Sequence, residues 1–326
     1  VNVPEYPLFQ YQPYELALSS KLVDTIKLYG IELLHVHYAI PHAYAGYMAK
    51  KMLKEEDIYI PMITTLHGTD ITLVGKHPFY RSAVTFSINK SDVVTSVSED
   101  LRKSTLEIFD VTQEIDVIPN FIDRRKYGDQ FTDCQRSSMA TEDERIVTHI
   151  SNFRKVKRIP DVIAIFNGIQ KRLPAKLVMV GEGPEKAAAE KQARQLGIED
   201  KVLFLGNSNE IDRILCFSDL FLLPSETESF GLAALEAMIN KVAVVSTNTG
   251  GIPEVNVHGE TGYMSDVGDV ESMIEQSIAV LADKDRLDEF KAKAYQRALQ
   301  FDIQHILPLY ESVYEKAYAQ RHKNAY

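Results

Sequence analysis

Cysteine is scarce in this 326-residue sequence, which contains only Cys134 and Cys216. The two are far apart and match no metal-binding or redox spacing, so we expect reduced thiols in a cytoplasmic protein. No apolar run approaches the ~20 residues that a membrane-spanning helix requires, and no stretch resembles a signal peptide. Lysine and arginine together are fewer than aspartate and glutamate, 36 against 46. The formal net charge of −10 argues against nucleic acid or an anionic membrane as a partner.

The remaining composition is that of an ordinary globular protein, with 45% hydrophobic and 25% charged residues. At roughly 100–200 residues per domain, the length favours two domains, each able to bury its own core. Because the protein is acidic, any anionic ligand would have to meet a local basic patch.

Short β-branched runs alternate with amphipathic helical stretches along the chain, which predicts an α/β fold with doubly wound parallel sheets. The predicted strands are Leu33–His37, Met62–Leu66, Val93–Val97, Ile115–Ile118, Ile146–Ser151, Lys176–Val180, Val202–Leu205, Leu220–Leu223 and Val242–Ser246. The predicted helices are Ser19–Tyr29, Ala43–Lys54, Glu99–Phe109, Asp161–Arg172, Glu185–Leu196, Glu210–Phe217, Gly231–Ile239, Val270–Ala282, Leu287–Gln300 and Ile306–Ala319.

The polar, irregular stretch Asn120–Glu144 is the expected linker between the two series. We therefore predict a first domain at 1–130 and a second at 144–300. A C-terminal helical segment is predicted at 301–326, and the sequence leaves open whether it crosses back to the first domain. Residues 1–13 are rich in proline and tyrosine and are expected to be a connecting segment.

The stretch 224–232 carries the strongest chemical signal, because it joins a predicted buried strand to a predicted helix. The amides of residues 229–231 would offer a phosphate the free N–H groups and the positive dipole of a helix N-terminus. Glu228 and Glu236 are eight residues apart, about 12 Å along a helix, which is roughly the span between the two sugars of a nucleotide-sugar diphosphate. Two isolated glutamates are more often a helix-start carboxylate and an exposed side chain, but the nearly all-apolar surroundings of Glu236 favour a functional role.

A basic segment, Ser151–Arg158, follows the first predicted strand of the second domain and holds four cations. At the carboxyl end of a strand, this segment is the best candidate to neutralise a diphosphate leaving group, although a solvated loop is an equal alternative. Two glycine-containing turns, Val180–Pro184 and Asn248–Val255, follow other strands and would face the same crevice. Each of these turns alone is also consistent with a plain loop.

Histidines end two predicted strands of the first domain. His67 is the favoured functional histidine because Gly68 beside it opens space for a substrate, although strand histidines are more often structural. We place His35 and His37 on opposite sides of their strand, which makes a shared metal site improbable. The only Asp-x-Asp sequence, Asp283–Asp285, lies between terminal helices, so we expect no metal-dependent sugar-nucleotide site.

Together these motifs resemble those of retaining glycosyltransferase family 4 over almost the whole chain. The family's motifs occur in order and are jointly specific: Val180–Pro184, Glu228-x7-Glu236, Gly250–Glu254 and Gly259–Tyr263. The resemblance implies the GT-B fold, with two Rossmann-like domains facing a cleft.

Within that family, the first domain resembles the enzymes of the first step of bacillithiol biosynthesis. The matching segments are His35–His42, Thr64–Asp70, Asn120–Asp123 and Ser151–Arg158. This resemblance implies transfer of N-acetylglucosamine from UDP-N-acetylglucosamine to the hydroxyl of L-malate, with retention at the anomeric carbon. It also implies that no cofactor or metal is needed.

The resemblance implies roles for residues of the donor site. Glu236 would hold the uridine ribose, and Glu228 would hold the donor sugar. Lys157 matches the family's phosphate lysine, and because Asn152 stands where most members have an arginine, Arg154 is the expected second cation. The remaining donor-site residues are expected to be Asn152, Gly181 and the amides of Ser229, Phe230 and Gly231.

For the acceptor side, the resemblance places His67 near the donor sugar and Tyr38 and Thr65 along the malate pocket. Malate is a dianion, so at least one cation should face it. Arg81 and Lys76 are the available candidates.

In the family, the first domain begins with a strand, a Gly/Ser-rich loop and a helix. We find none of these three elements before the Tyr/Pro-rich segment at the start of this sequence. We therefore expect weak or no transferase activity unless the chain is extended at its N-terminus. The alternatives are a family 4 transferase with another acceptor, an enzyme like the UDP-N-acetylglucosamine 2-epimerases, and a non-catalytic sugar-nucleotide-binding module. The sequence leaves open whether the protein is a homo-oligomer.

Overall fold

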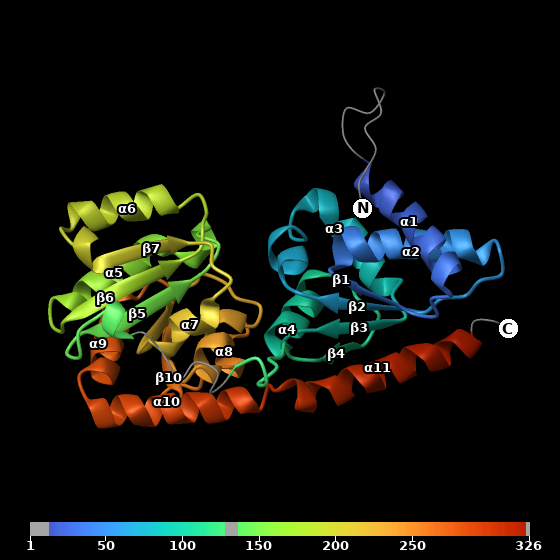
Figure 1. Cartoon of the computed structure of the whole chain (residues 1–326). Coiled ribbons are helices and arrows are strands. Elements are labelled where there is room, and N and C mark those ends of the chain that lie inside the picture. Colours follow the sequence, from blue (N-terminus) through green and yellow to red (C-terminus); the bar gives the residue numbers. More distant parts are fainter. Residues whose placement is uncertain (1–12, 128–135, 324–326) are drawn as a thin grey trace. The chain divides into compact units, whose positions relative to one another are not determined.

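The protein consists of two α/β units, each built on a parallel sheet (Figure 1). The computed structural model describes residues 13–127 and 136–323. Unit 1 comprises Val1–Pro119 and Ile306–Tyr326, and unit 2 comprises Asn120–His305. The predicted connecting segment falls almost wholly outside the described residues, as do residues 128–135 of the predicted linker.

Unit 1 contains a four-stranded parallel sheet in the order β1-β2-β3-β4. Its strands are β1 (Leu34–His37), β2 (Met62–Leu66), β3 (Val93–Ser96) and β4 (Ile115–Val117). Its helices are α1 (Tyr14–Tyr29), α2 (Tyr44–Lys54), α3 (Pro78–Asn89), α4 (Glu99–Ile108) and, from residue 306 onward, most of α11 (Ile303–Lys323).

Helices cover both faces of the first sheet, as the alternation of side chains along β2 requires. Met62 packs in a cluster with Ile26 of α1 and Leu53 of α2. The next residue, Ile63, points to the other face and packs with Val313 of α11. Figure 1 shows α1 and α2 in blue on one side of the sheet and α11 in red on the other. The last helix of the chain thus completes the core of the first unit.

Unit 2 contains a six-stranded parallel sheet in the order β10-β9-β8-β5-β6-β7. Its strands are β5 (Arg145–Ile150), β6 (Ala175–Val180), β7 (Val202–Gly206), β8 (Leu220–Leu223), β9 (Ala243–Thr247) and β10 (Gly262–Ser265). Its helices are α5 (Ile159–Gln170), α6 (Lys186–Gln195), α7 (Ile211–Cys216), α8 (Leu232–Ile239), α9 (Val270–Leu281) and α10 (Lys284–Leu299).

The order of the second sheet fixes where a ligand should bind. The chain runs outward from β5 through β6 to β7, then returns beside β5 and runs the other way from β8 to β10. The carboxyl ends of β5 and β8 therefore mark the topological switch point, where ligands bind in doubly wound sheets.

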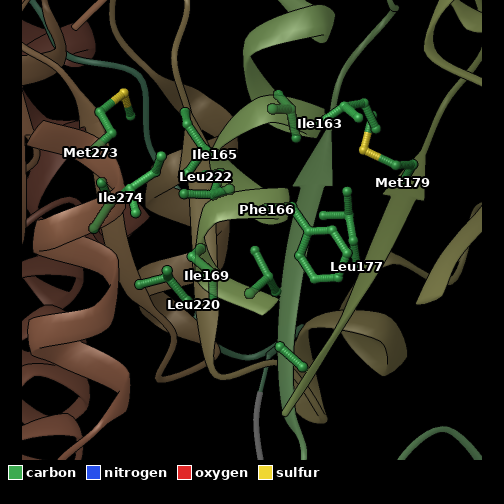
Figure 2. Packing of buried hydrophobic residues seen from close by; sticks show 14 of the residues in the cluster. Ile163, Ile165, Phe166, Ile169, Leu177, Met179, Leu220, Leu222, Met273 and Ile274 are labelled. Atoms are coloured by element: carbon green, nitrogen blue, oxygen red, sulfur yellow. The ribbon is translucent and has the colours of Figure 1, made fainter. Parts of the chain in front are cut away.

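The main core of unit 2 lies on one face of this sheet and holds it rigid. Phe166 of α5 packs beside Leu177 of β6, while Met273 of α9 and Leu222 of β8 extend the same cluster (Figure 2). Phe166 and Leu222 are fully buried. At roughly 1.5–3 kcal/mol for each such side chain, this packing anchors the strands from which the loops at the switch point depart.

Most predicted strands and helices agree with the structure to within a few residues. However, α3 and β10 were missed, α1 begins five residues before the predicted Ser19, and α11 is longer at both ends. The expectation of two reduced cysteines is wrong for Cys216, which is disulfide-bonded. Cys134 lies outside the described residues. Spacing along the chain excludes metal motifs, but it does not determine which sulfurs meet in space.

Candidate active site

A buried histidine fixes the loop that leaves β5. His149 Nδ1 lies 2.8 Å from the carbonyl oxygen of Leu222, and its Nε2 lies 2.8 Å from Ser151 Oγ. Because a carbonyl can only accept, Nδ1 carries the proton and Nε2 accepts from the Ser151 hydroxyl. Burial lowers the pKa of His149 to about 4, so the ring is neutral at pH 7. Ser151 Oγ accepts in turn from the Phe153 amide at 3.3 Å, which sets the start of the basic segment.

Lys157 of that segment forms an ion pair with Glu228 in the loop after β8. Both side chains are largely buried, with exposed fractions of 20% and 14%. The same Glu228 oxygen accepts from the hydroxyl of buried Ser225 at 2.9 Å. The structure thus brings together two of the predicted site residues, one from each side of the switch point. Since an ammonium group has three hydrogens, Lys157 can donate to Glu228 and to a phosphate at the same time.

The start of α8 offers backbone amides beside this pair. Gly231 precedes α8 and has a φ of 93°. Among the described residues, none accepts a hydrogen bond from the amides of Phe230 or Gly231. Together with the positive end of the helix dipole, these two amides make a ready anion site.

The predicted spacing of about 12 Å between Glu228 and Glu236 along one helix is wrong. Since α8 begins only at Leu232, Glu228 lies in the preceding loop. An estimate based on helical rise therefore does not apply to this pair.

Two glycines of the predicted motifs are required for loop packing. A Cβ on Gly181, which has a φ of +124°, would lie 1.8 Å from the carbonyl oxygen of Ser151. A Cβ on Gly250, with a φ of +60°, would lie 1.9 Å from the carbonyl oxygen of Glu228. No side chain fits at these distances. The backbone of each turn therefore packs directly against the backbone of a loop that carries the candidate site.

Glu236 lies on α8 beside Asp212 of α7. Burial and, to a lesser extent, the Asp212 charge raise the pKa of Glu236 to about 7. Burial, followed by the charges of Glu236 and Asp212, raises the pKa of Tyr127 to about 12. Within residues 13–127 and 136–323 no side chain donates to the carboxylate of Glu236, and Asn240 reaches only its backbone carbonyl, at 2.9 Å. The carboxylate is therefore available to accept from a ligand's hydroxyl groups.

The other predicted donor-site residues lie on the same loops. Asn152 and Arg154 are exposed in the basic segment, and Ser229 is half-buried between Glu228 and Phe230. The role of Arg154 as the second diphosphate cation stays a prediction.

In unit 1, the histidines form a contact chain on one face. The placement of His35 and His37 on opposite sides of β1 is wrong: their rings stack with centroids 4.6 Å apart. Side chains two residues apart on a strand point to the same face. His37 Nδ1 lies 2.8 Å from Nε2 of His67, and burial followed by the His37 charge lowers the pKa of His67 to about 4. No group of three or more potential ligands able to hold a metal occurs in the described part of the chain.

Sequence reasoning missed a buried carboxylate that organises this edge. Asp70 is 2% exposed, and its Oδ2 accepts from the Ala39 amide at 2.7 Å, just after β1. Its Oδ1 accepts from the amides of Gly68 at 3.0 Å and His67 at 3.3 Å, just after β2. Asp70 therefore ties together the carboxyl ends of two neighbouring strands. The signal was the aspartate three residues after His67, a spacing that suits capping of the intervening amides.

The predicted acceptor residues have different surroundings. Tyr38 lines a pocket of about 480 Å³ together with Asp70 and Glu15, and no lysine or arginine is among the described residues that line it. Thr65 is fully buried, and its hydroxyl bonds to His35 at 2.8 Å and Thr95 at 2.7 Å.

The two candidate cations do not lie in that pocket. Arg81, on α3, donates to the carbonyl of Ile108 at 2.6 Å, and Lys76 is exposed. The roles proposed for Tyr38, Thr65 and Arg81 in acceptor binding stay predictions.

Comparison with known proteins identifies the family. Residues 1–126 match the family model "Glycosyltransferase Family 4", and residues 131–297 match "Glycosyl transferases group 1". The chain is 44% identical over 316 residues to the N-acetyl-alpha-D-glucosaminyl L-malate synthase of Bacillus anthracis, across 96% of this chain and 82% of that protein. The chain belongs to glycosyltransferase family 4.

Other proteins are similar to the chain at lower sequence identity. The 2-deoxystreptamine N-acetyl-D-glucosaminyltransferase of Niallia circulans is 22% identical across 97% of this chain and 84% of that protein. The solved structure of Anabaena HepE with UDP has a TM-score of 0.79 at 21% identity, covering 92% of this chain and 82% of that one. Such structures share the GT-B fold, which confirms the predicted fold class. No described helix is long and apolar enough to cross a membrane.

Proposed function

We propose that this family 4 glycosyltransferase transfers N-acetylglucosamine from UDP-N-acetylglucosamine to the hydroxyl of L-malate, with retention and without a metal. The observation that carries the donor assignment is the Lys157–Glu228 pair beside the Phe230 and Gly231 amides, at the switch point of the second sheet. The similarity to the Bacillus anthracis synthase supports the acceptor.

In the proposed reaction, the malate hydroxyl oxygen bonds to the anomeric carbon on the face from which the bond to the UDP oxygen breaks. The hydroxyl proton passes to the departing phosphate. Lys157, Arg154 and the amides before α8 stabilise the negative charge that develops on that phosphate. Glu228 contacts the sugar hydroxyls, and Glu236 accepts hydrogen bonds from the ribose. Positioning and fixed dipoles therefore lower the barrier, and no enzymic nucleophile is required.

A second candidate acceptor is favoured by the pocket beside Tyr38. Its described lining includes Glu15 and Asp70 and no cation, which suits an uncharged polyol better than a dianion. An alternative function is therefore transfer from the same donor to a neutral cyclitol.

A UDP-release assay with UDP-N-acetylglucosamine and a panel of hydroxy acids and cyclitols tests the proposal. We expect release with L-malate, unchanged by EDTA. Turnover without any acceptor would indicate an epimerase, and release only with cyclitols would identify the second candidate. Tight UDP binding with no release under any condition would indicate a non-catalytic module.

A further inference from the structure

A basic pocket lies in unit 1, at the opposite end of β2 from His67. Its volume is about 290 Å³, and its walls include Lys50, Lys51, Lys54, Tyr47, Tyr59 and Asp92. Met62, the first residue of β2, donates its amide to Asp92 at 2.7 Å. His67 follows five residues later, which is about 17 Å along a strand at 3.3 Å per residue. The pocket therefore lies at the other edge of the first sheet from His67.

The acidic residue of this pocket is already neutralised. Asp92 forms an ion pair with Lys50, and the two side chains are 15% and 19% exposed. The carboxylate oxygen that meets Lys50 also accepts from Met62. Since Lys50 balances the charge of Asp92, the charges of Lys51 and Lys54 are not balanced by it.

Lys51 and Lys54 leave the pocket with uncompensated positive charge. Their ammonium groups lie 5.4 Å and 5.9 Å from the ring centroids of Tyr47 and Tyr59, within cation–π range. Neither forms an ion pair with any residue that the structure describes. The acids that follow Lys54 do not line the pocket, and one of them, Glu56, pairs with Lys27 instead.

We propose that this pocket is a second anion-binding site, which takes a small polyvalent phosphate. Two ammonium groups held over tyrosine rings in a concave site, in a protein of net charge −10, match a ligand that carries at least two negative charges. A phosphate group accepts charge-assisted hydrogen bonds from both lysines, and the rings of Tyr47 and Tyr59 form the apolar wall.

Calorimetric titration with inorganic pyrophosphate tests this site. We expect the affinity of the full chain to fall at least tenfold in Lys51→Ala/Lys54→Ala. The matched control, Lys21→Ala/Lys241→Ala, removes the same charge from exposed lysines, and Lys241 also lies over a tyrosine ring, at 5.3 Å. The control should bind like the unmodified chain.

Because the donor site also attracts phosphates, the titration includes Lys157→Ala. Binding that persists in Lys157→Ala and is lost in the Lys51/Lys54 variant supports the second site. The opposite pattern, or equal affinity in both double variants, overturns the proposal of a second site. Lys51 and Lys54 would then serve only to stabilise the negative end of the α2 dipole. Thermal melting of each variant confirms that loss of binding does not reflect unfolding.

Discussion

At the scale of single residues, the ion pair between Lys157 and Glu228 is the best-defined part of the candidate donor site. Ser225 holds the same carboxylate oxygen, so Glu228 has a fixed orientation before any ligand arrives. The two residues come from loops on opposite sides of the switch point, which explains why their contact could not be inferred from either motif alone.

We expect Lys157→Ala and Glu228→Ala each to lower kcat by about 10²–10³, as is typical when one fixed electrostatic contact to a transition state is removed. Steady-state UDP release measures the effect. Lys155→Ala is the matched control, since Lys155 is exposed two residues earlier in the same turn. An equal loss in the Lys155 variant would argue for a general charge effect rather than a specific contact.

Glu236 should make UDP binding depend on pH. Its pKa is raised from the ordinary 4.5 to about 7, so the carboxylate is half-ionised near neutrality. Because an ionised carboxylate is the stronger acceptor for ribose hydroxyls, UDP affinity should rise by up to about tenfold between pH 6 and pH 8. Titration of UDP itself is common to all variants, so the difference between the native chain and Glu236→Gln isolates this residue. Identical pH profiles for the two proteins would contradict the assignment.

The same shift has an opposite consequence for stability. Between pH 4.5 and about 7 the folded protein retains the Glu236 proton more firmly than the unfolded chain does. The folded state therefore binds more protons, and the contribution of Glu236 to the free energy of unfolding falls as the pH rises through that window.

At the scale of secondary-structure elements, Asp70 joins the carboxyl ends of β1 and β2. An asparagine has the same shape but only one acceptor oxygen, so Asp70→Asn cannot satisfy the Ala39 and Gly68 amides together. We expect it to lower the free energy of unfolding by about 1–3 kcal/mol. Urea denaturation provides the measurement, with the exposed Asp57→Asn as a reference. A stability equal to that of the native chain would show that Asp70 is dispensable to this edge.

The contact between the Gly250 turn and the Glu228 loop can be separated from backbone strain. Gly250 and Gly259 both have positive φ, but a Cβ on Gly259 meets nothing within 4 Å. Gly259→Ala should therefore lose only the roughly 1–2 kcal/mol of left-handed strain, whereas Gly250→Ala should lose more, along with UDP affinity, because the Glu228 loop must move. Urea midpoints and UDP titrations compare the two. Equal losses of stability would mean that the close approach is not needed.

Most elements could be predicted because their apolar periodicity is strong, and the missed ones lack it. In α3 only Val84, Ser87 and Ile88 are buried, and its first turn is exposed, so no apolar stripe marks it as a helix. β10 is a four-residue edge strand that begins with Gly262 and lies beside β9. Tertiary pairing, rather than local sequence, defines both elements.

The candidate site was predictable only in part for a similar reason. Motif order located Lys157 and Glu228 in the segments after β5 and β8, and Glu236 on α8, the helix that follows β8. The contacts that orient them come from residues with no motif of their own, such as buried His149 and Ser225. Burial depends on the assembled fold, and a lone serine or histidine in the sequence does not reveal it.

At the scale of the whole molecule, each unit has a hydrophobic core of its own, so the stabilisation that a ligand gives to unit 2 can be followed in that unit. The chain leaves unit 1 at Pro119 and returns at Ile306, so each sheet has its own hydrophobic cluster. A ligand held by unit 2 alone stabilises that unit by mass action, about 2.7 kcal/mol at a hundredfold excess over its Kd.

Hydrogen exchange in the presence of UDP should therefore slow in unit 2 and stay unchanged in α1 and β1 of unit 1. We expect the largest gain in protection in peptides that cover 151–158 and 224–236, where the basic segment and the start of α8 would hold the diphosphate and ribose. Peptides from α1 and β1 should exchange at unchanged rates, because nothing in the proposed UDP site belongs to them. A Glu228→Ala, Glu236→Ala double variant serves as the control, since it should lose the protection while keeping its baseline exchange. Protection centred on β1 and β2 instead would place the nucleotide in unit 1 and overturn the assignment of the donor site to the second sheet.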